Sequence, residues 1–160
     1  MQACNKQKGY SIREKGGSIV TALPLYHTFS LTVNCLFFIK KGNSNILITN
    51  PGDIPAFIKI LKKQPFHYFT GLNTLFNTLL QSPLINSVDF SHLKVTLAGG
   101  MATQQSIAND WKKLTGCTVI EVTECAPMVS VNFPFNNSIG LPLPSTDIRL
   151  VLENGLIVEN

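Results

Sequence analysis

Short apolar runs alternate along this chain with longer stretches in which apolar residues recur at helical spacing. The apolar runs predict five strands, at residues 18–23, 46–49, 66–71, 93–98 and 118–121. Strands that alternate with helices are typical of βαβ units, in which the sheet is mainly parallel. The pattern therefore predicts an α/β fold, a mainly parallel sheet with helices on both faces.

Four helices are expected between these strands. The first covers residues 29–40, with Gly42 after its end. The second follows the turn at 50–53 and ends at Lys62 and Lys63, the third covers 73–81, and the fourth runs through Leu114 from an N-cap at Thr103 to Gly116. Apolar stripes predict which side chains are buried in the second and third helices: Ile54, Phe57, Ile58 and Leu61, then Leu75, Phe76, Leu79 and Leu80.

From Pro127 onward the pattern changes to short β pieces. Residues 147–152 and 156–158 flank the turn Glu153-Asn154-Gly155, which predicts a β-hairpin. We therefore expect the fold to end in a short hairpin region.

Composition narrows the class of protein. The chain has 160 residues, about one domain, of which 44% are hydrophobic and only 14% charged. This balance suits a protein whose faces are covered, and it predicts exposed apolar patches if the chain stands alone. The net charge of +4 comes from scattered lysines, which does not indicate a nucleic-acid-binding surface.

Targeting and metal-binding signals are weak. The apolar stretch 29–39 is too short for a transmembrane helix, and residues 1–17 lack the apolar centre of a signal peptide. Four cysteines form no C-x-x-C pair, and three histidines are dispersed. We expect a reduced, cytoplasmic chain without structural zinc.

Candidate functional residues follow the predicted strands, because ligands of open α/β sheets bind at the carboxyl ends of strands. Gly99 and Gly100 would let a flat or phosphorylated ligand approach the backbone, although a lone Gly-Gly is also common in ordinary turns. Thr123 and Glu124 could hold a phosphate and its Mg²⁺, or could simply be a polar strand end. His27 could be a gate, a hydrogen-bonding group or a general base, or a surface residue.

Six phenylalanines leave a similar choice. They could line an apolar tunnel, but aromatic side chains at helix and strand spacing more often form a core. The six are Phe29, Phe37, Phe38, Phe66, Phe69 and Phe76.

Taken together, the motifs resemble those of the AMP-forming acyl-CoA synthetases, and most closely the bacterial long-chain fatty-acid–CoA ligases. Five segments occur in the family's order and near its spacing: 22–27 with Pro-Leu-Tyr-His, 65–76 with Thr-Gly-Leu-Asn-Thr-Leu-Phe, 98–101, Thr-Glu-Cys-Ala-Pro at 123–127, and 140–144. The resemblance covers residues 18–158, nearly the whole chain.

The resemblance implies a reaction and roles for individual residues. Fatty acid and ATP would give an acyl-adenylate and pyrophosphate, and coenzyme A would then take the acyl group. Thr123 and Glu124 would be catalytic, Thr123 holding phosphate and Glu124 the Mg²⁺ that stabilises charge on the leaving pyrophosphate. The substrate-binding residues would be His27, Thr74, Gly99, Gly100 and Met101.

The chain also departs from the family pattern. The family places a Ser/Thr/Gly-rich phosphate loop upstream of the Pro-Leu-Tyr-His segment and a C-terminal domain downstream, and the 160 residues contain neither. Val122 stands where the family has Gly-Tyr-Gly-Leu, so the adenine-stacking aromatic is missing. The interpretation is that residues 1–160 are part of the N-terminal AMP-binding domain and are inactive alone.

Alternative functions stay open on sequence grounds. The chain could be a non-catalytic fatty-acyl-binding module or a non-functional gene remnant. Complementing chains that complete the enzyme, and peripheral contact with the inner face of the membrane, are compatible with the sequence but not indicated by any motif.

Overall fold

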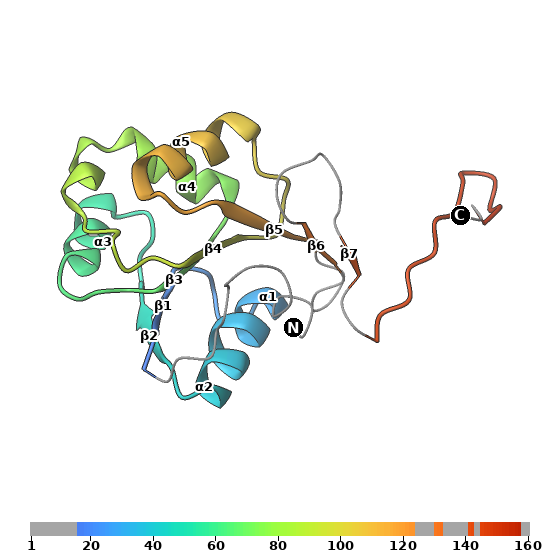
Figure 1. Ribbon diagram of the computed structural model, residues 1–160, viewed down its shortest axis with the longest axis horizontal. Helices are drawn as coiled ribbons and strands as arrows, with labels where there is room; N and C mark the ends of the chain where they lie inside the picture. Colours follow the sequence, from blue (N-terminus) through green and yellow to red (C-terminus); the bar gives the residue numbers. More distant parts are fainter. Residues whose placement is uncertain (1–15, 124–129, 133–140, 143–144, 158–160) are drawn as a thin grey trace.

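The computed structural model describes residues 16–123, 130–132, 141–142 and 145–157, and its centre is one twisted sheet (Figure 1). The sheet has the order β2-β1-β3-β4-β5-β6-β7. The first five strands pair in parallel, whereas β6 and β7 are antiparallel. The strands are β1 (Ser18–Thr21), β2 (Ser44–Leu47), β3 (Tyr68–Gly71), β4 (Val95–Ala98), β5 (Val119–Thr123), β6 (Ser130–Asn132) and β7 (Leu141–Pro142).

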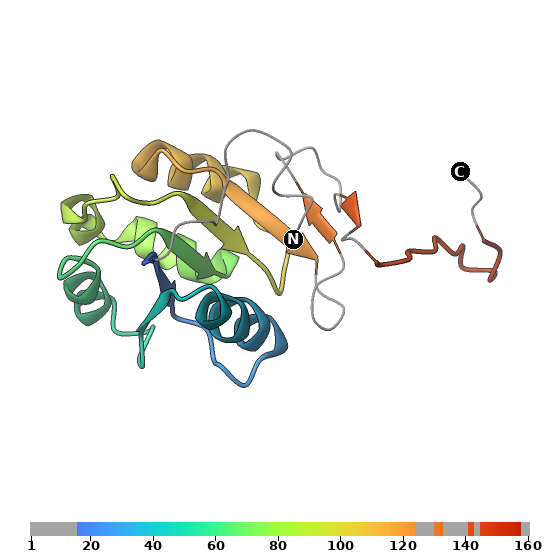
Figure 2. The same cartoon turned by 60° about the horizontal axis from the view of Figure 1, so that its bottom comes forward.

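Helices cover both faces of the sheet, as Figures 1 and 2 show, so the predicted α/β class is confirmed. One face carries a single helical segment, residues 28–40, made of α1 (Thr28–Ser30), the π-helical η2 (Leu31–Phe37) and α2 (Phe38–Lys40). The other face carries α3 (Ile54–Leu61), α4 (Asn73–Gln81), the 3₁₀ turn η3 (Pro83–Ser87) and α5 (Gln105–Thr115). The predicted helix at 73–81 has the observed bounds.

Successive residues of each strand point to opposite faces and fill two separate cores. Val20 and Phe69 face α3, α4 and α5, whereas Ile19 and Tyr68 face the segment 28–40. Trp111 lies in the larger core with its Nε1 donating to Thr96 Oγ1 at 3.1 Å. Five of the six phenylalanines weighed as tunnel lining are at most 1% exposed, so they belong to the cores: Phe29, Phe38, Phe66, Phe69 and Phe76.

Helix boundaries follow local capping where the chain supplies a cap. Asp53 caps α3 by accepting the Ala56 N–H at 3.0 Å, and Gly116 ends α5 in the left-handed conformation at φ +72°. The predicted N-cap Thr103 is wrong. The N-cap of α5 is Gln104, one residue later, and the backbone N–H of Thr103 instead donates to Glu121 of β5.

The predicted C-terminal hairpin is reduced to its tip. Val151 and Ile157 form an isolated bridge, and Leu152 N–H donates to the Leu156 carbonyl at 2.8 Å around Gly155. No longer ladder forms among described residues 145–157, since this arm extends from the body without a surface to pack on (Figure 1).

Candidate functional site

The site expected of this fold lies where the chain direction across the sheet reverses. The segment 28–40 leads from β1 outward to β2 on one face, whereas α4 and α5 lead from β3 to β4 and β5 on the other. This makes the carboxyl ends of β1 and β3 a topological switch point, and open α/β sheets bind ligands in the crevice outside such a point. The loops that follow Thr21 and Gly71 therefore border the candidate site.

His27 stands in the loop after β1, at the N-cap of α1. Its backbone N–H donates to the Pro24 carbonyl at 3.0 Å, and its Nδ1 accepts the Phe29 N–H at 3.3 Å. A neutral ring then carries its proton on Nε2. The residue is exposed, so the imidazole is oriented by its own helix and accessible from solvent.

The loop after β4 contains the glycine pair. Gly99 is buried and donates to the Gly71 carbonyl at 3.3 Å, which joins the ends of β4 and β3. Gly100 has φ +78°, and a Cβ there would lie 2.9 Å from Leu72 Cδ2. The positive φ favours glycine at position 100, and a Cβ there would require the Leu72 side chain to shift. The next residue, Met101, is 51% exposed.

Two side chains that the sequence did not single out hold this glycine loop in place. Asn73 Oδ1 accepts the Gln104 N–H at 2.9 Å, and Glu121 Oε1 accepts the Thr103 N–H at 2.5 Å. They come from the neighbouring strands on either side, β3 through the start of α4 and β5. The sequence signal that could have pointed to Glu121 is a carboxylate between the apolar residues of a predicted strand.

A buried polar network lies beneath the switch point. Asn34 of η2 is fully buried and its Nδ2 donates to Thr21 Oγ1 at 2.9 Å and to Thr70 Oγ1 at 2.7 Å. Thr21 Oγ1 in turn donates to Asn45 Oδ1 at 2.7 Å. These bonds fasten the segment 28–40 to β1, β2 and β3, and thereby hold the helix that begins at His27. Within the described residues Asn34 Oδ1 has no protein partner.

The structure describes some of the other predicted site residues fully and others only in part. Thr74 is exposed in the first turn of α4, just after β3. Thr123 is the last residue of β5 and its backbone pairs with Ser130 of β6. Val122 is 5% exposed and packs in the smaller core, so it does not substitute for an aromatic wall of the site. Glu124 lies outside the described residues.

The described residues hold no group of three histidine, cysteine or acidic side chains that could bind a metal ion. Burial raises the pKa of the Cys117 thiol, which favours the protonated, unreactive form. A cavity of about 290 Å³ lies at the opposite, amino edge of the sheet and is bordered by Lys62, Lys63, Asp89 and His92. None of the described helices is long and apolar enough to cross a membrane.

The chain has an open, mainly parallel α/β sheet with a glycine turn beside its switch point, and comparison with protein families makes the assignment specific. Residues 1–160 match the family described as AMP-binding enzyme. The chain belongs to this family.

Similar proteins of known function make the family comparison more specific. The chain is 54% identical over 141 residues to a long-chain-fatty-acid–CoA ligase of Escherichia coli and 51% identical over 145 residues to one of Haemophilus influenzae. The alignments cover 83% and 86% of this chain but 25% and 26% of the relatives. The chain therefore spans about a quarter of the length of the curated relatives it matches.

Solved structures confirm the fold. The anthranilate CoA ligase AuaEII, solved in complex with anthranoyl-AMP, superimposes with a TM-score of 0.81 at 21% identity. The match covers 92% of this chain and 30% of that chain. Similarity at this identity establishes the shared architecture.

Proposed function

We propose that this chain supplies one wall of the adenylate-forming site of a long-chain fatty-acid–CoA ligase. The whole protein would join a fatty acid to CoA at the expense of ATP and release AMP and pyrophosphate. One observation carries the proposal: the loops with His27 and Gly100 and the end of β5 at Thr123 lie at the carboxyl edge of one parallel sheet, in a chain 51% and 54% identical to two such ligases.

Each residue has a role in this proposal. His27 gates the acyl-adenylate region, and Thr74 lies near the wall of the acyl channel. Gly99, Gly100 and Met101 run along the adenosine and the acyl group, and the positive φ of Gly100 forms the turn that places this loop after β4. The N-terminus of α5 faces the same edge and its N–H groups favour an anion.

Thr123 would hold a phosphate and Glu124 would hold Mg²⁺. The metal, when bound with ATP, would neutralise charge on the departing pyrophosphate. Within the described residues the support is positional, because Thr123 ends β5 beside the glycine loop.

We also propose that the 160 residues form part of the N-terminal AMP-binding domain and do not catalyse the reaction alone. Val122 is buried in β5 at the position where the family has an aromatic residue for adenine. Strand β5 continues from Val122 to Thr123 without an intervening loop. Misplacement by about 1 Å can cost a hundredfold in rate. The expected cellular location is the cytoplasm.

The test is fatty-acid-dependent pyrophosphate release by the purified 160-residue chain with ATP, Mg²⁺ and a long-chain fatty acid. The intact Escherichia coli ligase serves as the positive control. We expect no turnover above the blank, and turnover comparable with that of the control would refute the proposed inactivity. Equilibrium dialysis with labelled fatty acid and AMP accompanies the assay, since stoichiometric binding of the fatty acid without AMP would favour a non-catalytic acyl-binding module.

A further inference from the structure

The arm at residues 145–157 carries the only asparagine–glycine pair of the sequence, Asn154-Gly155. Both residues are exposed at the tip of the arm, which extends away from the sheet (Figure 1). Because glycine has no Cβ, its backbone nitrogen is the least hindered nucleophile that can follow an asparagine. Attack of that nitrogen on the side-chain amide converts an asparagine into a cyclic imide. The tip therefore combines a reactive pair of residues with access for water and base.

The turn folds the two reacting groups toward each other. Asn154 Oδ1 accepts the Leu156 N–H at 3.1 Å, an Asx-turn, in which an asparagine side chain bends back over the backbone that follows it. The donated hydrogen bond draws electron density from Cγ of Asn154, which makes this carbon a better electrophile. The side-chain amide is thus activated by the same contact that holds it along the Gly155 backbone.

One hydrogen bond opposes the reaction. The Gly155 N–H donates to the Leu152 carbonyl at 2.8 Å, and the nitrogen can attack only when this bond opens. The tip is closed by this bond, by the Leu152–Leu156 bond and by the isolated bridge between Val151 and Ile157. A lone two-stranded hairpin is marginally stable in water, and exposed hydrogen bonds with few packed neighbours open at low free-energy cost. We therefore expect the Gly155 nitrogen to be released frequently.

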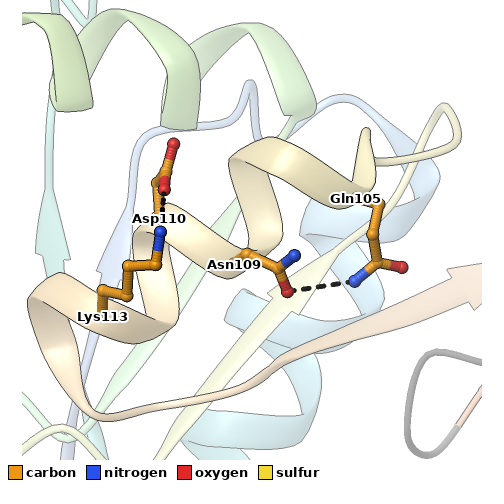
Figure 3. Close-up of polar contacts among 4 residues, drawn as sticks. All are labelled: Gln105, Asn109, Asp110 and Lys113. Atoms are coloured by element: carbon orange, nitrogen blue, oxygen red, sulfur yellow. Dashed lines mark hydrogen bonds and ion pairs between the residues drawn. The ribbon is translucent and has the colours of Figure 1, made fainter.

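Helices hold other exposed asparagines in an unreactive geometry. Asn109 lies in α5, where its Oδ1 accepts from Gln105 Nε2 at 3.1 Å (Figure 3). Asn86 precedes a small residue, Ser87, but lies in η3, where its Nδ2 donates to the Pro83 carbonyl at 3.4 Å. A helical backbone is fixed by hydrogen bonds to the preceding turn, so the next nitrogen cannot rotate toward the side-chain carbon. The structure therefore separates Asn154 from these residues.

We propose that Asn154 is a site of spontaneous deamidation, at which the arm acquires an aspartate or isoaspartate residue. The Gly155 nitrogen loses its proton to base and bonds to Asn154 Cγ, and Nδ2 leaves with a proton as ammonia. Water then opens the imide: cleavage between Cγ and the nitrogen gives aspartate, whereas cleavage between the backbone carbonyl carbon and the nitrogen gives isoaspartate. Either product adds a carboxylate to a chain of net charge +4. The inference does not depend on the proposed ligase function.

Isoaspartate would also change the turn itself. Its main chain contains an additional carbon, which moves Gly155 away from the Leu152 carbonyl and disrupts the pairing of Leu152 with Leu156. The arm would therefore lose its turn, whereas the two cores contain no residue of the arm and would be retained.

The test is incubation of the purified 160-residue chain at neutral and at mildly alkaline pH. Peptide mass spectrometry follows the conversion of Asn154, and enzymatic methylation of isoaspartate distinguishes the two products. We expect conversion to accelerate at the higher pH, because the attacking nitrogen must lose its proton. Gly155→Ala should slow conversion by about tenfold or more, because the added Cβ hinders that nitrogen. This substitution lies in the exposed tip and leaves the body intact.

Ser87→Gly is the matched control, because it places a second asparagine–glycine pair in η3 at an exposed position. In the folded variant, verified by circular dichroism, Asn86 should convert about tenfold more slowly than Asn154, since η3 must open first. In urea the two sites should convert at similar rates. The inference is overturned by an unmodified Asn154, by a rate unchanged in Gly155→Ala, or by equal rates at Asn86 and Asn154 in the folded variant.

Discussion

At the scale of single residues, the candidate site depends on side chains that position backbone rather than on those expected to touch a ligand. Glu121 and Asn73 each accept an N–H from the loop between Gly100 and α5. A glycine-containing loop has many accessible conformations, so acceptors fixed on neighbouring elements narrow its conformation before any ligand binds. The geometry of the glycine loop therefore depends on β5 and α4.

Substitution Glu121→Ala should make the Thr103 amide exchange with solvent at least tenfold faster, because a hydrogen bond to a carboxylate contributes about 1.5–3 kcal/mol. Asn73→Ala should act on the Gln104 amide, by a smaller factor. Hydrogen exchange followed by NMR measures both.

Glu121→Gln keeps an acceptor and should retain most of the protection of the Thr103 amide. The Gly116 amide, bonded to the Lys112 carbonyl at 2.8 Å at the far end of α5, is the internal control. Unchanged exchange at Thr103 in Glu121→Ala would show that the carboxylate does not hold the loop.

At the scale of elements, the close packing of β3 and α4 brings Gly71 against the ring of Phe76. A Cβ on Gly71 would lie 2.8 Å from Phe76 Cζ, and the ring is fully buried beside Trp111 with centroids 4.8 Å apart. The end of β3 and helix α4 can therefore pack this closely only because residue 71 has no side chain.

Gly71→Ala should lower the free energy of unfolding by about 1–3 kcal/mol, the usual cost of overpacking a filled core. Urea titration followed by Trp111 fluorescence measures this change. Gly52→Ala is the matched control, because a Cβ at Gly52 meets only Asn50 Oδ1, at 3.5 Å, and the backbone is unstrained. Equal midpoints for the two variants would contradict the packing argument.

At the scale of the whole molecule, apolar surface is distributed unevenly. Two cores lie on the two faces of the sheet, yet the arm at 145–157 exposes Leu150, Val151, Leu152, Leu156 and Ile157, each more than half accessible. The described hydrogen bonds of the arm's tip are internal. The arm therefore adds little to the stability of the body.

Shortening the chain to residues 1–144 should change the free energy of unfolding by no more than about 0.5 kcal/mol, as for surface changes away from packed features. The measurement is the urea midpoint reported by Trp111. A loss of about 2 kcal/mol or more would mean that the arm packs on the body in solution.

Much of the fold follows from local rules that the sequence states directly. Helix α4 has its predicted bounds, and Asp53 and Gly116 mark the ends of α3 and α5, because caps act through hydrogen bonds between near neighbours in the chain. The alternation of strand and helix similarly predicted the parallel sheet. The order of motifs predicted the family, since each motif is itself a short segment.

Other features arise from contacts between distant segments, which a one-dimensional pattern does not contain. Thr103 was expected to cap α5, but the N-cap is Gln104, and the Thr103 N–H donates to Glu121, 18 residues away. The π-helical stretch in 28–40 and its buried Asn34 likewise involve partners on three strands. A sequence motif gives the types of residue present in a short segment. Which distant residues they contact depends on how the helices pack across the sheet, and so only the tertiary structure decides it.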